Sequence, residues 1–163
     1  STLRLGWYKV YKPIQYYAAY FTVRGEDFDG LVVMKGRDAL KKKMAEIMNK
    51  GKEASAKEQS AYSTFQIVNE MLARGIKVLP VDLYKSDSHK FLVEDGKIRL
   101  PFSSLSGVGQ SAAQCLVDSR AEGKYISIDD IQIKSKVTKA VIETLEEAGV
   151  LKDLPRSNQI SFF

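Results

Sequence analysis

The residues of this chain whose types and spacing best suit binding chemistry stand in one short segment, residues 105–113. It reads Leu-Ser-Gly-Val-Gly-Gln-Ser-Ala-Ala, so two glycines bracket one valine between two predicted helices. We expect the glycines to allow backbone conformations and a close approach that a Cβ atom would block, and the valine to fix the hairpin to the core. The amides that follow would stand at a helix N-terminus, where partial positive charge can hold a phosphate oxygen. The candidate phosphate contacts are Ser106, Gly107, Val108, Gly109, Gln110 and Ser111.

Contacts of this kind recognise the backbone of a nucleic acid rather than its bases, so the predicted binding is independent of base sequence. A tight turn between two helices, with no ligand, is the competing interpretation, and the Gly-Val-Gly tripeptide alone does not decide between them. The residues Ala112, Ala113 and Leu116 favour the nucleic-acid interpretation, because they supply the small and apolar positions that a packed helical hairpin needs.

A second helical hairpin is predicted further along the chain, with helices over residues 128–133 and 136–148. Its turn contains no glycine, so any phosphate contact would depend on side-chain cations and hydroxyls together with the free amides of a helix start. The candidates are Lys134, Lys136, Thr138 and Lys139. A solvated charged face remains an equal alternative for these residues.

The charge of the chain fits a polyanionic partner without requiring one. The formal net charge is +5 and the pI is near 9.2, a mild basic excess. The excess is local to residues 35–57. In that stretch Lys35, Arg37, Lys41, Lys42, Lys43, Lys50, Lys52 and Lys57 face only Asp38, Glu46 and Glu53.

The remaining composition argues against a disulfide-rich, a metal-binding, a membrane-spanning or a secreted protein. A single cysteine, Cys115, cannot form an internal disulfide framework and fits a reducing cytosol; we expect it to be a small core residue. The lone histidine, His89, is predicted to lie in a loop rather than to bind a metal. The longest apolar-looking stretch, residues 14–23, is too short to span a bilayer, and no signal peptide opens the chain. The chain therefore reads as a cytoplasmic protein with no membrane partner.

The elements that must position the two turns are mostly helical. Apolar residues recur at helical spacing over residues 13–23 and 37–48 and in a stripe from Phe65 to Leu72 that Gly75 ends. Residues 31–34 are ambiguous, and residues 51–60 indicate a linker or a fraying helix start. A short strand is predicted over residues 76–79, and a hairpin with an Asp-Gly turn over residues 91–100. Helices follow over residues 102–105, 110–121 and 136–148. The predicted fold class is mainly α with a small β-hairpin.

Several segments, in this order, resemble the alpha subunit of bacterial DNA polymerase III of the Gram-positive PolC type, a C-family replicative polymerase. They are residues 7–13 (Trp-Tyr-Lys-Val-Tyr-Lys-Pro), 17–22 (Tyr-Ala-Ala-Tyr-Phe-Thr), 74–82 (Arg-Gly-Ile-Lys-Val-Leu-Pro-Val-Asp), the hairpin 91–100, the turn 105–113, and 141–151 (Val-Ile-Glu-Thr-Leu-Glu-Glu-Ala-Gly-Val-Leu). The resemblance covers nearly the whole chain and implies that the chain is the C-terminal end of such a polymerase subunit.

The resemblance implies four parts. Residues 1–80 would be the C-terminal part of the polymerase fingers, 81–101 a β-hairpin connection, 102–154 a tandem helix-hairpin-helix region that binds duplex DNA, and 155–163 a tail that binds the sliding clamp. The catalytic palm, with its metal-binding aspartates and Mg²⁺, would lie before Ser1. We therefore expect no catalytic residue, metal or cofactor in this chain, and assign no such role to Asp27, Asp29 or Asp38. The expected partners are double-stranded DNA, the sliding clamp (beta), and the palm, thumb and N-terminal fingers.

The last residues resemble the clamp-binding tail of this family, usually Gln-Leu-Ser-Leu-Phe. Here they are Gln159, Ile160, Ser161, Phe162 and Phe163, with isoleucine and phenylalanine at the two leucine positions. An apolar group of this size at a terminus would stay in water unless it docked into a groove. Folding back onto its own domain is the alternative.

The resemblance thus implies a fragment of a DNA-directed DNA polymerase, a nucleotidyltransferase of chromosomal replication, that is inactive without its palm. A stand-alone helix-hairpin-helix accessory protein of DNA binding or repair is the alternative. RNA binding is the weaker option, because no exposed stacking pattern or glycine-rich RNA-binding signature appears.

Overall fold

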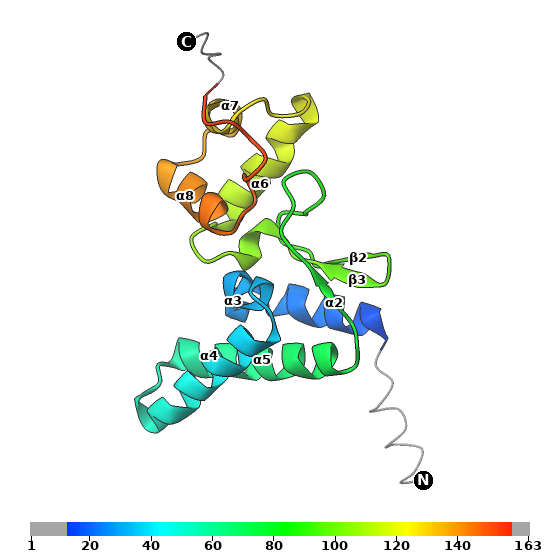
Figure 1. Cartoon of the computed structure of the whole chain (residues 1–163), viewed down its shortest axis with the longest axis vertical. Helices are drawn as coiled ribbons and strands as arrows, with labels where there is room; N and C mark the ends of the chain where they lie inside the picture. The colour runs from blue at the N-terminus through cyan, green and yellow to red at the C-terminus, as the bar shows by residue number, and fades with distance from the viewer. Residues whose placement is uncertain (1–12, 158–163) are drawn as a thin grey trace.

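The computed structural model describes residues 13–157 and has the predicted fold class, mainly α with a small sheet. Helices α2 to α5 form one end of an elongated molecule, helices α6 to α8 form the other, and the strands lie between them (Figure 1). Within the described residues, no helix combines the length and the apolar character that a bilayer span needs.

The first helix of the described residues, α2 (Ile14–Val23), confirms the prediction for residues 13–23. Proline 13 precedes it in an extended conformation, where its missing N–H removes no helical hydrogen bond. A 3₁₀ turn, η1 (Gly25–Asp27), leads to α3 (Gly30–Met34). The carboxylate of Asp29 caps α3 by accepting from the Val32 amide at 3.3 Å, so the ambiguous apolar run is helical.

Two longer helices, α4 (Arg37–Lys50) and α5 (Ala56–Ala73), pack side by side. The 3₁₀ turn η2 (Gly51–Glu53) connects them. Residues 51–60, predicted as a linker or a fraying helix start, divide into both: residues 51–55 link the two helices, and residues 56–60 are the start of α5. That start is capped, because Ser55 and Glu58 form a reciprocal capping box in which each side chain accepts from the other's amide. The Ser-x-x-Glu spacing carries that signal in the sequence.

A three-stranded sheet joins the two ends of the molecule. The hairpin strands β2 (Leu92–Glu94) and β3 (Lys97–Arg99) pair antiparallel as predicted. Asp95 and Gly96 both have positive φ, 51° and 73°, as a tight two-residue hairpin turn requires. The strand β1 (Val78–Leu79) pairs parallel to β3, which the sequence pattern did not predict.

An aromatic cluster holds the N-terminal helices to the sheet. The rings of Phe21, Phe28 and Phe91 lie with centroids 4.7 to 5.6 Å apart, and all three side chains are buried. Such tilted and edge-to-face arrangements stabilise by about 0.5–1.5 kcal/mol per pair beyond the burial itself. The amide of Phe91 also donates to the Thr22 hydroxyl at 3.0 Å, so α2 and the hairpin form one unit.

The C-terminal end contains the predicted helices with shifted ends. The elements are η3 (Phe102–Ser104), α6 (Gln110–Ser119), η4 (Arg120–Glu122), α7 (Ile128–Ser135) and α8 (Lys139–Glu147). One expectation is wrong: Cys115 is exposed. Its neighbours Ala113 and Leu116 are buried, and at about 100° per residue the cysteine faces away from the core that they define.

The loop between β1 and β2 fastens this end to the rest of the molecule. The amides of Phe102 and Ser103 donate to the carbonyls of Asp87 and Ser88, both at 3.0 Å. Arg120 donates to the carbonyls of Leu83, at 3.2 Å, and Ser86, at 2.6 Å. The Tyr84 and Tyr125 rings stack with centroids 6.1 Å apart. The loop therefore holds both η3 and the end of α6, and His89 lies in it as predicted.

Candidate nucleic-acid interface

The first hairpin turn connects η3 to α6. Gly107 has a φ of +98°, which an L-amino acid with a side chain rarely adopts. Val108 is 3% exposed, so it fixes the turn to the core as expected. Its amide donates to the Leu105 carbonyl at 3.0 Å. Gly109 then returns to an extended conformation, with φ −70° and ψ 168°, and α6 begins.

The two glycines of this turn do not have the same role. A Cβ on Gly107 would lie 3.0 Å from Oγ1 of Thr144 in α8, so positive φ and close approach both favour glycine there. At Gly109 no atom lies within 4 Å of the same position and φ is ordinary. The expectation that a Cβ would be blocked is therefore confirmed at Gly107 and wrong at Gly109, which instead leaves open space in front of α6.

The N-terminus of α6 presents amides that the described chain does not use. The first helical hydrogen bond runs from Ala113 to the Gly109 carbonyl at 2.9 Å. The four amides of Gly109, Gln110, Ser111 and Ala112 have no acceptor among residues 13–157, and Gly109 has no side chain to cap them. The side chains of Ser106, Gln110 and Ser111 are exposed beside them. Amides and hydroxyls together form a donor surface for an anion.

The second hairpin turn repeats the backbone of the first. Lys136 has a φ of +61°, Val137 is 6% exposed, and Thr138 is extended with φ −73° and ψ 162° before α8 begins. Positive φ, buried valine and extended cap thus follow one another at Lys136–Val137–Thr138 as at Gly107–Val108–Gly109. In the sequence, the valine before each cap residue indicates that the two turns are alike. The second turn has no glycine, so this likeness was not recognised from the sequence.

The second turn differs from the first in the groups that it offers. The Thr138 hydroxyl accepts from the Val141 amide at 3.3 Å, so this helix start is already capped. The Lys134 ammonium lies 3.2 Å from the Asp130 carboxylate and 5.9 Å from the Tyr125 ring centroid. Lys136 and Lys139 are exposed and have no ion pair among the described residues. Phosphate contacts here would depend on these two cations, as the sequence suggests.

The carboxylate that engages Lys134 belongs to the scaffold. Asp130 accepts from the Ile126 amide at 3.0 Å, and its own amide donates to the Ser127 hydroxyl at 3.0 Å. The Ile126 amide and then the Lys134 ammonium lower the pKa of Asp130 below its ordinary value. The group is therefore ionised near neutral pH and, from the first turn of α7, keeps Lys134 in the last turn of the same helix occupied.

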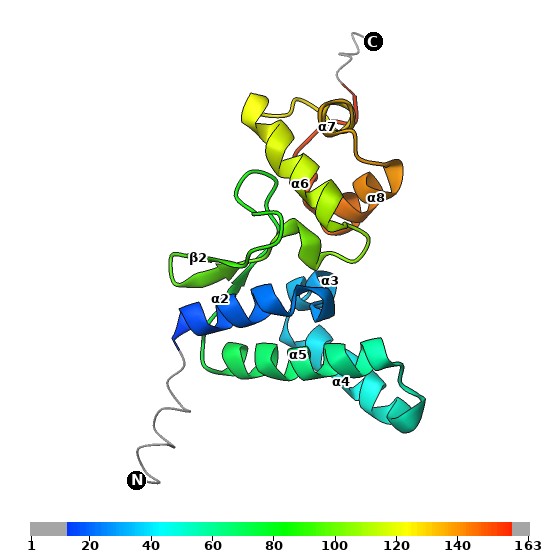
Figure 2. The same ribbon diagram turned by 180° about the vertical axis from the view of Figure 1, so that it is seen from behind.

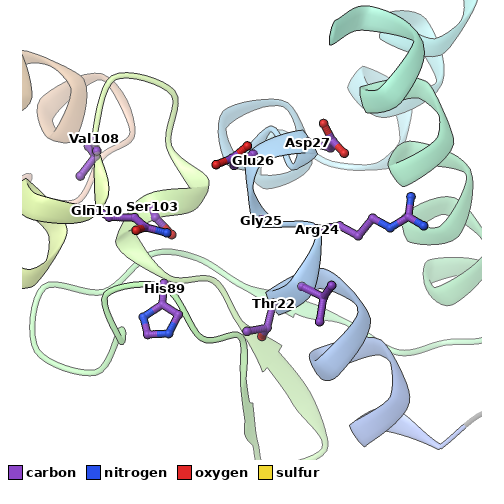
Figure 3. Close-up of a pocket in the computed structure, with 11 residues that line it drawn as sticks. Thr22, Arg24, Gly25, Glu26, Asp27, His89, Ser103, Val108 and Gln110 are labelled. Carbon is purple, nitrogen blue, oxygen red and sulfur yellow. The ribbon is translucent and has the colours of Figure 1, made fainter. Parts of the chain in front are cut away.

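A cavity of about 410 Å³ opens beside the first turn, between it and the end of α2. The side chains of His89, Ser103 and Gln110 line one side, and Thr22 and the η1 turn line the other (Figure 3). Glu26 and Asp27 bring two carboxylates to that second side, against one cation, Arg24, whose guanidinium carbon lies 5.2 Å from the Tyr20 ring centroid. The carboxylates outnumber the cation and would repel a phosphate, so the outer surface of the turn is the better phosphate site, and the cavity marks its boundary.

The other candidates named from the sequence have different positions. The tail residues Gln159, Ile160, Ser161, Phe162 and Phe163 lie outside the described residues. Asp29 serves as the cap of α3, and between residues 13 and 157 no three metal-ligating side chains lie close enough to hold an ion.

Comparison with known proteins agrees with this geometry. The helix-hairpin-helix motif family matches residues 75–160, about half of the chain. The DNA polymerase III PolC-type proteins of Clostridium perfringens and Halalkalibacterium halodurans are each 45% identical over 161 residues, and that of Caldanaerobacter subterraneus is 44% identical over 160 residues. These alignments cover 98–99% of the chain but 11% of each relative. The chain therefore belongs to the helix-hairpin-helix family and is similar over nearly its whole length to one segment of the PolC-type DNA polymerase III proteins.

Proposed function

We propose that this chain is the part of a replicative DNA polymerase that holds duplex DNA by its sugar-phosphate backbone. The observation that carries the proposal is the set of four unused amides at the start of α6, displayed by a turn that Gly107 and Val108 fix in place. Amides at a helix N-terminus attract anions through both hydrogen bonding and the helix dipole. The second turn adds the exposed cations Lys136 and Lys139, so the two turns bind phosphates by different groups.

Binding of this kind is expected to be independent of base sequence, because the proposed contacts run from backbone amides and lysine point charges to phosphates, which carry no base information. The test is fluorescence anisotropy of the 163-residue chain with two duplexes of unrelated sequence over a range of salt concentrations. We expect equal affinities and a log–log slope of about −0.9 for each phosphate neutralised. Affinity that differs strongly between the duplexes, or does not change with salt, would contradict the proposal.

The wider role that we propose belongs to the whole polymerase, of which the chain spans 11% of the length of its relatives. In the whole polymerase, residues 1–80 would form the C-terminal part of the fingers, and residues 81–101 would connect them to the duplex-binding region. Residues 102–154 would bind the duplex, and residues 155–163 would bind the sliding clamp. DNA-directed DNA synthesis in the cytoplasm would be the activity of the whole. Its Mg²⁺ would be held by the palm and not by this chain, so the chain alone should not extend a primer.

A further inference from the structure

The basic excess of the chain gathers on one projecting part of the structure. Within residues 35–57, cationic side chains outnumber acidic ones by as much as the formal charge of the whole chain, +5. The helices α4 and α5 and the turn η2 between them carry this stretch. They project from the body of the molecule at the end opposite the hairpin turns (Figure 1). The excess is therefore concentrated in one part of the molecule and is not spread evenly over it.

Some of these cations are already engaged by neighbours. Lys43 lies 4.0 Å from Glu46, Lys50 lies 2.6 Å from Glu58, and Arg37 donates to Asn69 at 2.9 Å. Others are exposed, with no ion pair or hydrogen bond to any residue between 13 and 157. We call four of these the lysine arm: Lys41, Lys42, Lys52 and Lys57.

The end of α4 that η2 joins to α5 reaches the same edge of the molecule as the segments that lead into α6 and α8. In Figure 1 the segments that lead into α6 and α8 reach the left edge, as does the far end of α4; in Figure 2, seen from behind, all three reach the right edge. The β2–β3 turn lies at the opposite edge in both views. One edge of the molecule therefore carries the start of α6, the start of α8 and the turn η2. Two residues of the lysine arm belong to that last part, Lys52 in η2 and Lys57 at the start of α5.

We propose that the lysine arm binds the phosphates of the same DNA duplex that the hairpin turns hold, farther along its axis. The inference rests on the proposed function. A duplex bends little over such lengths, since its persistence length is about 150 base pairs. A straight duplex that lies on one edge of the molecule can thus meet features at both ends of that edge. Lysine suits this contact as a mobile point charge that neutralises phosphate without reading bases.

The test compares two duplex lengths with a matched pair of variants of the 163-residue chain. A duplex of about 10 base pairs covers one helical turn, and one of about 30 base pairs extends about 100 Å at 3.4 Å per pair. The variant Lys52→Ala with Lys57→Ala removes two charges from the arm, at η2 and at the start of α5. The control, Lys77→Ala with Lys97→Ala, removes the same charge near β1 and at the β2–β3 turn. Circular dichroism verifies that both variants fold.

We expect the arm variant to bind the long duplex more weakly and with a salt slope smaller by about 1.8, from two lost phosphate contacts at about 0.9 each. The short duplex should bind equally well to both variants. An arm variant indistinguishable from the control on the long duplex would overturn the inference. A loss of affinity seen only with a duplex that carries a single-stranded overhang would also overturn it. So would an acidic protein that displaces the long duplex from the wild type but not from the arm variant. If the wild type binds neither duplex, the proposed function itself fails.

Discussion

Replacing Gly109 with aspartate should separate the binding role of the α6 N-terminus from its folding role. Gly109 is the cap residue, its φ is −70°, and a Cβ there meets no atom within 4 Å. Aspartate is therefore accommodated without strain and is among the preferred cap residues. Its carboxylate would accept from the amides of Ser111 or Ala112, the groups that we assign to the phosphate. Capping and DNA binding then compete for the same donors.

The two effects have opposite signs. The cap should stabilise the fold by a few tenths of a kcal/mol, since glycine is only slightly worse than the best caps, and the helix dipole adds about 0.3–1 kcal/mol. Losing one charge-assisted hydrogen bond to phosphate costs about 1.5–3 kcal/mol of binding energy, or about 10- to 100-fold in affinity. A protein that is more stable and binds DNA less tightly is the expected result.

Urea denaturation and anisotropy on a short duplex measure the two quantities. Gly109→Asn is the matched control, because asparagine caps a helix as well as aspartate but adds no charge. We expect the asparagine variant to lie between the wild type and the aspartate variant in affinity, and to be less stable than the aspartate variant only by the dipole contribution of about 0.3–1 kcal/mol. If Gly109→Asp raises stability yet keeps the affinity and salt slope of the wild type, phosphate does not bind at these amides.

Three further outcomes are expected. Gly107→Ala should lower the free energy of unfolding by about 1–3 kcal/mol because φ is positive there. Adding Thr144→Ala should recover only the part of this loss that is due to contact with Thr144. An unchanged urea midpoint for Gly107→Ala would refute this. The Arg99 guanidinium lowers the pKa of Glu94 below its ordinary 4.5. This ion pair therefore stabilises the fold above pH 4.5, and its contribution is lost as the pH falls through the lowered pKa. Glu94→Gln should make the urea midpoint less dependent on pH in the acid range, and an unaltered pH profile would contradict this. Deleting residues 159–163 should abolish co-sedimentation with the sliding clamp while leaving duplex affinity intact, and retained co-sedimentation would exclude the tail.

Local patterns in the sequence predicted most of the elements. The helical spacing of Tyr17 and Phe21, the Asp95–Gly96 turn and the Gly107–Val108–Gly109 hairpin each depend on neighbouring residues, and each is present. The parallel pairing of β1 with β3 was not predictable in this way, because register between segments about twenty residues apart depends on the packing of the whole.

The second turn shows why the candidate site was harder to predict than the fold. A left-handed residue is usually glycine, yet Lys136 adopts that conformation because Val137 and the cap at Thr138 fix the residues after it. Residue type also failed to show that Asp130 already holds Lys134. These are tertiary effects, which a reading of residue types and spacing does not contain.

The fastening of the loop between β1 and β2 has a mechanical consequence. Backbone hydrogen bonds join it to η3, and the Arg120 guanidinium joins it to the end of α6, so it holds both sides of the first turn. A load applied to the turn would pass through short, directional bonds into the sheet and then into the phenylalanine cluster against α2. Tension on a bound strand would therefore move the two ends of the molecule together as one rigid body.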